Sequence, residues 1–337
     1  MRKTVSFTRH SANIFFHLLT RCNLHCRHCY INPGQHGRNT LDIDTINRWL
    51  ALFADRHPSS NVIFLGGEPT MHPDLSIAVK QARQLGYASV TIDTNGYLFH
   101  DILDRVNPEE VDYFSFSLDG PSPSVNDPLR GSGSFEQCTH GITAAKKRGF
   151  NVSLIYTVSC ANIDHLHHMP PLLEALGVDR FFIQVIGVRG QWIDDAHHRD
   201  ALAQVDRDTW LAVIPQVAED AARRGITATF PKVFLEPEEP FECAGLVADN
   251  YFIFPNGRVY RCPLCEDYPL HSLEIPDDRL VETAKVNEDD LFPLVIPEGC
   301  VMNRIVQPRN LLPADGGKPA YKIACCMLKE EITPDSG

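Results

Sequence analysis

The 337-residue sequence lacks any apolar run of the ~20 residues that a membrane-spanning helix needs. It also lacks a signal peptide, because the basic segment at residues 1–11 is followed neither by an apolar core nor by a small-residue cleavage site. Positive charge is scarce, and the net charge of −12 argues against a partner that presents a phosphate backbone. We therefore expect a cytoplasmic protein that binds neither a membrane nor a nucleic acid.

The composition is sufficient for an ordinary folded core. Hydrophobic residues make up 43% of the chain and charged residues 22%, which suits one large α/β domain with a smaller appendage. Eleven cysteines would fit a secreted, disulfide-bonded protein. Because no signal peptide is present and several cysteines are closely spaced, we interpret them as metal ligands in a reducing compartment.

Strand-like apolar runs alternate with helical patterns over the first two thirds of the chain. The predicted strands cover residues 13–19, 62–65, 89–93, 113–118, 151–158 and 180–186. The predicted helices cover residues 44–56, 74–85, 98–106, 134–148, 163–176 and 205–224. Six strand–helix repeats imply a parallel sheet with right-handed crossovers. A full barrel, a partial barrel and an open doubly wound sheet all satisfy this pattern.

Each predicted strand is followed by a distinctive loop. These loops are residues 22–29, 66–70, 94–96, 117–120, 157–159 and 187–190. Because the carboxyl ends of parallel strands share one face, we expect the six loops to converge on one active-site rim.

The first loop carries three cysteines. Cys22, Cys26 and Cys29 form a C-x3-C-x2-C pattern, and three thiolates within eight residues are suited to a soft metal centre. In a cubane iron–sulfur cluster they would leave one iron without a protein ligand. A structural zinc site with His25 or His28 as the fourth ligand is the alternative, but no second cysteine pair lies nearby in the sequence.

The triplet, followed by the aromatic Tyr30, resembles the signature of the radical S-adenosylmethionine (SAM) enzymes. The segment 66–69 (Gly-Gly-Glu-Pro) resembles the motif with which that family grips the SAM amino group, Glu68 offering a carboxylate to the ammonium. Segments 94–96 and 117–120 resemble the later SAM-facing strand ends. The resemblance covers roughly residues 13–190 and implies SAM contacts at Gly66, Gly67, Glu68, Asn95, Ser117 and Arg130.

A further stretch resembles the subgroup that carries auxiliary clusters. It comprises residues 126–130 and 133–135, and Arg130 is the implied partner of the SAM carboxylate. The chain departs from the family here, because Asn126 stands where a histidine is usual.

The resemblance implies a partial (β/α)6 barrel at residues 10–228 with a SAM-binding [4Fe–4S] cluster on Cys22, Cys26 and Cys29. In such enzymes a reduced cluster passes an electron to SAM, the C5′–S bond breaks, and the 5′-deoxyadenosyl radical removes a hydrogen atom from the substrate. An electron donor such as flavodoxin or ferredoxin is an implied partner.

The regular alternation stops past Ile226. Asn256 and Gly257 join two short β-prone runs and predict a hairpin, with Cys243 before it and Cys262 and Cys265 after it. This spacing resembles the SPASM and twitch extensions of radical SAM enzymes. It implies a small cysteine-rich domain at residues 229–337 that holds one auxiliary [4Fe–4S] cluster.

The ligand set of that second centre is only partly determined. The resemblance favours Cys243, Cys262 and Cys265, with Cys326 as the fourth ligand. Cys325, Cys300 and a substrate atom are alternative fourth ligands, and zinc held by four thiolates is the alternative centre.

Residues outside these motifs give weaker indications. Gln184 and Arg189 follow the sixth strand and are placed to face a substrate. The acidic pair 194–195 is either a base or an ordinary helix start. Cys138 and Cys160 are expected to be small buried hydrophobic residues.

Two enzyme hypotheses differ in substrate. The resemblance favours modification of a peptide or protein side chain, and radical oxidation or rearrangement of a small alcohol, sugar or other metabolite is the alternative. Only about a dozen residues precede the first strand, so we expect any leader recognition to come from a separate protein. A zinc-stabilised, non-catalytic binding protein is the third hypothesis, and it does not explain the glycine-rich loops.

Overall fold

The barrel is built from seven parallel strands. The computed structural model describes residues 4–190, 202–306 and 319–334. Its parallel strands are β1 (Ala12–Leu19), β2 (Asn61–Gly66), β3 (Ser89–Thr94), β4 (Tyr113–Ser117), β5 (Val152–Val158), β6 (Arg180–Val185) and β7 (Thr227–Pro231). They follow one another in sequence order across the sheet, each paired in parallel with the next.

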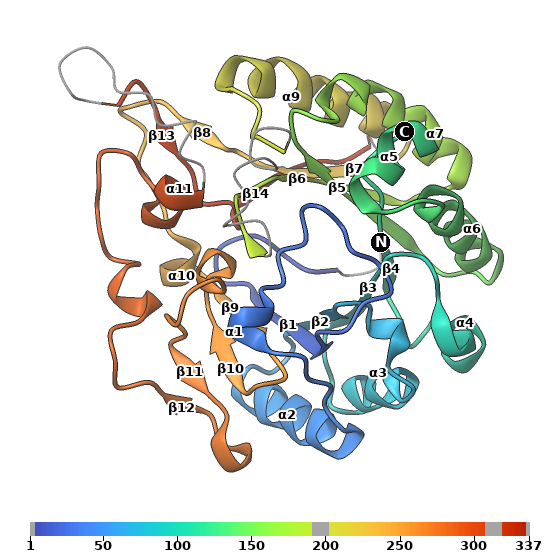
Figure 1. The fold of residues 1–337 in the computed structure, drawn as a ribbon, viewed down its shortest axis with the longest axis vertical. Helices are drawn as coiled ribbons and strands as arrows, with labels where there is room; N and C mark the ends of the chain where they lie inside the picture. Colours follow the sequence, from blue (N-terminus) through green and yellow to red (C-terminus); the bar gives the residue numbers. More distant parts are fainter. Residues whose placement is uncertain (1–3, 191–201, 307–318, 335–337) are drawn as a thin grey trace.

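Helices cover the outer face of this curved sheet (Figure 1). The α-helices of the barrel are α1 (Pro33–His36), α2 (Ile43–Arg56), α3 (Leu75–Gln84), α4 (Ile102–Arg105), α5 (Pro123–Arg130), α6 (Ser134–Lys147), α7 (Met169–Leu176) and α9 (Arg207–Arg223). Helix α2 shows why they form: the Asp42 carboxylate caps its first turn by accepting from the Thr45 amide. Its buried residues recur at helical spacing, so one face of the helix packs against the sheet.

The strands are apolar runs because helices bury one of their faces and the barrel interior buries the other. In β2 the four residues from Val62 to Leu65 are all buried. A run without polar alternation is the pattern expected of parallel strands covered on both sides.

The C-terminal part of the chain continues the same sheet at both edges. It contains β8 (Phe234–Leu235), β9 (Asp249–Ile253), β10 (Arg258–Tyr260), β11 (Leu273–Glu274), β12 (Val281–Glu282), β13 (Lys322–Ile323), β14 (Lys329–Ile332), α10 (Ala244–Val247) and α11 (Val301–Val306). Strand β9 pairs in parallel with β1, and β14 pairs antiparallel with β7. Strands β8 and β13 form a separate two-stranded sheet.

The structure confirms the α/β fold and the mostly parallel sheet. All six predicted strands are present, and the predicted hairpin is β9–β10 around the turn at residues 254–257. The elements that were not predicted include β7 and α5 in the barrel. Strand β7 is a short run that ends in a proline, and α5 contains Pro128, so neither has the usual sequence pattern of its element. The predicted domain boundary after residue 228 falls inside β7, and the division into two domains stays a prediction.

In the residues that the structure describes, no helix has both the length and the apolar character that crossing a bilayer requires.

Candidate functional site

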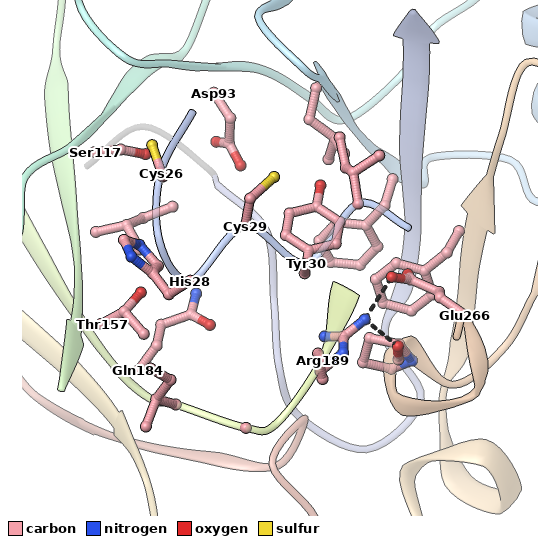
Figure 2. A pocket seen from close by; sticks show the side chains of 18 of the residues that line it. Cys26, His28, Cys29, Tyr30, Asp93, Ser117, Thr157, Gln184, Arg189 and Glu266 are labelled. Atoms are coloured by element: carbon pink, nitrogen blue, oxygen red, sulfur yellow. Dashed lines mark hydrogen bonds and ion pairs between the residues drawn. The ribbon is translucent and has the colours of Figure 1, made fainter. Parts of the chain in front are cut away.

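A cavity of about 340 Å³ lies at the carboxyl ends of the parallel strands (Figure 2). Residues from all six predicted loops line it, together with residues from the C-terminal part of the chain. Those from the loops include Cys22, Cys26, Cys29, Gly66, Gly67, Glu68, Thr94, Asn95, Ser117, Thr157, Gly187 and Arg189. The expectation that these loops share one rim is therefore confirmed by their common cavity.

The three cysteines after β1 form what we call the N-terminal thiol loop (Cys22, Cys26 and Cys29). The loop is held by backbone hydrogen bonds, from the Cys29 amide to the Cys26 carbonyl (3.2 Å) and from Arg27 to Leu129 of helix α5 (2.8 Å). Burial raises the pKa of Cys22 to about 12 and that of Cys29 to about 11, and the neighbouring thiols act in the same direction. Three adjacent buried thiols are chemically suited to a thiolate-bound cluster.

The two histidines of the loop do not point to zinc. His28 pairs with Asp119 (3.0 Å from Nε2 to Oδ2), and His25 is exposed. Within the described ranges, no group of three or more His, Cys, Asp or Glu side chains forms a site for a single metal ion. The structure therefore gives His28 a role in holding the loop against β4.

The glycines after β2 allow two loops to lie in contact. The Gly67 amide donates to the Leu19 carbonyl (2.9 Å), and the Glu68 amide donates to the Arg21 carbonyl (3.1 Å). A Cβ atom on Gly66 would lie 2.2 Å from the Leu19 oxygen, and one on Gly67 would lie 2.1 Å from the Arg21 oxygen. Only glycine fits at both positions, so these residues fix the N-terminal thiol loop against the strand ends.

Glu68 is buried and held in one orientation. Its Oε1 accepts from the Thr70 amide (3.0 Å) and from the hydroxyls of Thr70 (2.6 Å) and Thr94 (2.9 Å), and its Oε2 accepts from the Asn95 amide (2.7 Å). Burial raises the pKa of this carboxyl, while these hydrogen bonds act in the opposite direction. Asn95 in turn donates from Nδ2 to Asn23 in the N-terminal thiol loop (2.8 Å). Glu68 thus borders the cavity as a preoriented carboxylate.

Asp119, just after β4, pairs with both His28 and Arg130, which the sequence analysis treated separately. Its Oδ2 lies 2.5 Å from Nε of Arg130 and 3.0 Å from Nε2 of His28, and its Oδ1 accepts from the Thr157 amide (2.7 Å). Burial raises the pKa of Asp119, but Arg130 and His28 outweigh that effect and leave the pKa below its usual value. Asn126 fills the place of the usual histidine by accepting from the Asp119 amide (2.9 Å).

A second ion-pair network joins the barrel rim to the C-terminal part. The Arg189 guanidinium donates to the Glu266 carboxylate (2.6 Å), an interaction drawn in Figure 2, and lies 5.4 Å from the centre of the Tyr30 ring. The Tyr30 hydroxyl pairs with Nε2 of His17 (2.9 Å). Because Tyr30 follows Cys29 and Glu266 follows Cys265, this network connects the two cysteine-rich regions.

The cavity also contains two ionisable groups that sequence reasoning missed. Asp93 precedes the third loop on β3, and Figure 2 shows its carboxylate pointing into the same space as Cys26 and Cys29. Burial raises its pKa to about 7. Lys329, on β14, lines the cavity as well, and burial lowers its pKa to about 8. Asp93 is the one charged residue of β3, a signal that could have identified it.

Six cysteines of the C-terminal part gather in one region. We call Cys243, Cys262, Cys265, Cys300, Cys325 and Cys326 the C-terminal thiol group. Five of them belong to one packed cluster or lie against it, and Cys243 lies near enough to Cys262 and Cys325 for their charges to raise its pKa. Burial raises the pKa of Cys243 to about 12. The group contains every thiol named as a candidate ligand of the second centre.

Cys325 and Cys326 differ in one respect. Cys326 lines the cavity and Cys325 does not. Both thiols raise the pKa of the buried Cys300, and Cys325 also raises the pKa values of Cys243 and Cys262. Cys300 and Cys325 therefore pack in the same cluster as Cys262, Cys265 and Cys326.

The remaining sequence expectations have mixed outcomes. Cys138 is buried as expected, but Cys160 is exposed, because it follows the end of β5 on the rim. Gln184 and Arg189 both line the cavity, as predicted. The acidic pair 194–195 lies outside the described residues.

Fold and site together define an α/β barrel whose rim presents a cysteine triplet beside a glycine-rich loop. The sequence profile of the Radical SAM superfamily matches residues 17–169. The chain is 31% identical over 228 residues to "Pre-heme d1 synthase" of Dinoroseobacter shibae, an alignment that covers 63% of this chain and 52% of that protein. It is 29% identical over 163 residues to "Probable GTP 3′,8-cyclase" of Saccharolobus solfataricus, covering 48% of this chain and 53% of that protein.

Solved structures share the fold. SuiB of Streptococcus suis bound to S-adenosylmethionine superimposes with a TM-score of 0.67 at 14% identity, over 88% of this chain and 74% of that one. SuiB has also been solved bound to its precursor peptide SuiA. Residues 17–169 thus match the domain of the radical SAM superfamily, whose members are enzymes that use a [4Fe–4S] cluster and SAM. It spans about half the length of the curated relatives that it matches.

Proposed function

We propose that this chain reductively cleaves SAM at a [4Fe–4S] cluster held by Cys22, Cys26 and Cys29. One observation carries the proposal: these cysteines, the Gly66–Glu68 loop and the later strand ends line a single cavity. When bound, the reduced cluster supplies the electron that breaks the C5′–S bond of SAM and yields the hydrogen-abstracting 5′-deoxyadenosyl radical.

The chain's own residues orient SAM within the cavity. Gly66 and Gly67 bring the backbone close to the cysteine loop, and Glu68 presents a fixed carboxylate to the SAM ammonium. Asn95 and Ser117 border the same space. Arg130 donates from its remaining N–H groups to the SAM carboxylate while Asp119 fixes its Nε end.

We further propose that the C-terminal thiol group holds one auxiliary [4Fe–4S] cluster in a twitch-like domain. Support comes from the gathering of six thiols around one packed core. Cys243, Cys262 and Cys265 are the first three ligands in this proposal, with Cys326 as the fourth and Cys325 or Cys300 as its alternatives. Electrons reach the protein from a donor such as flavodoxin or ferredoxin. A cytoplasmic location, where thiols stay reduced, suits this chemistry.

For the substrate, a peptide or protein side chain is the first candidate. The C-terminal cysteine hairpin supports it, since the sequence resembles the extensions of peptide-modifying enzymes, and SuiB has been solved with a precursor peptide. A small metabolite is the second candidate. It is favoured by the names of the sequence relatives at 31% and 29% identity, a pre-heme d1 synthase and a probable GTP 3′,8-cyclase.

Anaerobic reconstitution with iron and sulfide tests the proposal. We expect about eight irons per chain, from two cubane clusters, and 5′-deoxyadenosine on addition of SAM and a reductant. If the protein held about four irons and still formed 5′-deoxyadenosine, the proposed auxiliary cluster would be wrong and the proposed SAM cleavage would stand. A fully loaded protein that forms no 5′-deoxyadenosine would refute the proposed function.

A further inference from the structure

Lys329 projects into the cavity from the last strand of the sheet. It is the first residue of β14 and lies opposite Pro231 of β7 in the register of the two strands. Its side chain is half-buried and lines the same cavity as the N-terminal thiol loop. Its Nζ lies 4.4 Å from the centre of the Phe7 ring, close enough for a cation–π interaction.

The other side-chain cations of the cavity already have carboxylate partners. Arg130 pairs with Asp119 at 2.5 Å, and Arg189 pairs with Glu266 at 2.6 Å. Lys329 has no carboxylate within 4.0 Å in the part of the chain that the structure describes. Cys326 and Asp93 are near enough for their charges to act on Lys329, but Asp93 does not form an ion pair with it.

An ammonium held in this way favours an incoming anion. Taking a cation out of water is costly unless a counter-charge compensates for it, and the face of one aromatic ring compensates only in part. The cavity offers no internal counter-ion in contact with Lys329 among the described residues. A ligand that brings its own negative charge therefore gains a charge-assisted hydrogen bond and relieves the unpaired cation.

We propose that Lys329 binds a carboxylate of the substrate and thereby determines which C–H bond faces the SAM side of the cavity. The inference rests on the proposed function and names a chemical class for its substrate. A carboxylate fits better than a phosphate, because a single ammonium is available and the carboxylates of Asp93 and Glu68 border the same cavity. A phosphate dianion would be repelled by these two groups more strongly than a carboxylate.

Paired probes that differ only in charge test this proposal. The glutamate and glutamine forms of an N-acetylated, C-amidated amino acid represent a peptide source, and glutarate with glutaramide represents a metabolite source. Binding to the iron-loaded, SAM-bound protein is measured by calorimetry, with inorganic phosphate as a further probe. In at least one pair we expect the carboxylate to bind about tenfold tighter than its amide, which is the range of a hydrogen bond to a charged group.

Three variants test whether Lys329 causes the tighter binding of the carboxylate probe. Lys329→Met should abolish it, and Lys329→Arg should retain most of it, because the positive charge remains. Lys322→Met is the matched control and should leave the preference intact, since Nζ of Lys322 donates to the Glu239 carbonyl (2.7 Å) and does not line the cavity. Whichever probe pair shows the preference identifies the source of the carboxylate.

Several results would overturn the inference. They are equal binding of carboxylate and amide in both pairs, tighter binding of phosphate than of every carboxylate, and a carboxylate preference that survives Lys329→Met. A loss of SAM affinity in Lys329→Met as large as the loss of carboxylate affinity would assign the ammonium to SAM instead. Formation of 5′-deoxyadenosine is measured separately, so failure of the inference and failure of the proposed function are distinguishable.

Discussion

The N-terminal thiol loop and the C-terminal thiol group are built in different ways. The first places three thiols within eight consecutive residues after one strand. The second assembles six thiols that are spread over residues 243–326, and the packing of separate segments brings them together. The comparison shows that one site is encoded locally by spacing, whereas the other exists only after the fold has formed.

The charges around the two sites also differ. A buried carboxylate next to the first site, Asp119, is paired with two basic side chains, Arg130 and His28. The buried carboxylate next to the second site, Glu288, accepts from the amides of Arg261 (2.6 Å) and Cys262 (2.8 Å) and from Ser272. Cations thus hold the first site in place, while backbone and hydroxyl donors hold the second.

The largest expected effect separates the two sites by function. Cys26→Ala should abolish 5′-deoxyadenosine formation, because SAM cleavage depends on the cluster that the N-terminal thiol loop holds. The measurement is 5′-deoxyadenosine per reconstituted chain, quantified by mass spectrometry. Cys160→Ala is the control, since this thiol is exposed and lies outside both sites, and it should behave as the unsubstituted protein. If the Cys26→Ala protein still formed 5′-deoxyadenosine, the assignment of the N-terminal thiol loop as the holder of the SAM-cleaving cluster would be wrong.

The next effect concerns iron content. Cys262→Ala should lower the iron per chain from about eight to about four, because this thiol interacts with five others of the C-terminal thiol group. The measurement is iron and acid-labile sulfide after reconstitution. An iron content that stays at about eight would show that Cys262 is not a required ligand of the second cluster.

Asp119→Asn should destabilise the protein by about 3–5 kcal/mol, because it leaves the buried Arg130 without its counter-charge. The measurement is the free energy of unfolding by denaturant at neutral pH. The matched control is Asp104→Asn, whose exposed ion pair with Arg148 should contribute about 0–1 kcal/mol.

The destabilisation caused by Asp119→Asn should depend on pH in a defined direction. The folded-state pKa of Asp119 lies below its usual value, so its contribution to stability is present at neutral pH. That contribution is lost as the pH falls below the unfolded pKa. Equal destabilisation by the two substitutions would contradict the role given to Asp119.

At the second site, Glu288→Ala should lower the free energy of unfolding by about 3 kcal/mol. It would leave the amides of Arg261, Cys262 and Ser272 without their acceptor, and buried donors without partners cost about 1–3 kcal/mol each. Denaturant unfolding measures the change. Glu282→Ala on the exposed strand β12 is a suitable control and should change stability by less than about 0.5 kcal/mol. A Glu288→Ala protein as stable as the control would show that these hydrogen bonds do not hold the site together.

The smallest expected effect is on the pH dependence of stability. Burial raises the folded-state pKa of Asp93 to about 7, so the folded state binds more protons than the unfolded state between pH 4 and 7. The stability of the unsubstituted protein should therefore fall as the pH rises through this window. Asp93→Asn should flatten that fall by about 1 kcal/mol, because the half-buried carboxylate borders the cavity and its charge is partly screened. Parallel stability curves for the two proteins between pH 4 and 7 would argue against the raised pKa.

The difference between the two sites also explains what the sequence could predict. The triplet and the Gly66–Gly67 loop were found because their spacing and composition are local features. The sequence names Cys300, Cys325 and Cys326 as candidate fourth ligands beside Cys262 but does not choose among them, because that choice depends on how segments far apart in sequence pack. Long-range packing of this kind leaves no periodic signal in a single chain.

The interior of the barrel shows the same limit. Asp93 and Lys329 are 236 positions apart, and they face one cavity only because β14 returns to pair with β7. Neither β7 nor β14 has a recognisable strand pattern, so nothing in the sequence connects the two side chains. The six predicted strands, by contrast, were found from their apolar runs to within one residue at every end.

The arrangement of the sheet has a consequence for any shortened form of this protein. Strand β9 pairs with β1 from Ala12 to Phe16, and β14 pairs with β7 from Ala228 to Pro231. A chain cut just after β7 would lose both neighbours and expose two rows of unpaired backbone N–H and C=O groups. Exposed strand edges of this kind are templates for self-association. Proteolytic loss of the C-terminal part would therefore produce an aggregating fragment rather than a smaller working barrel.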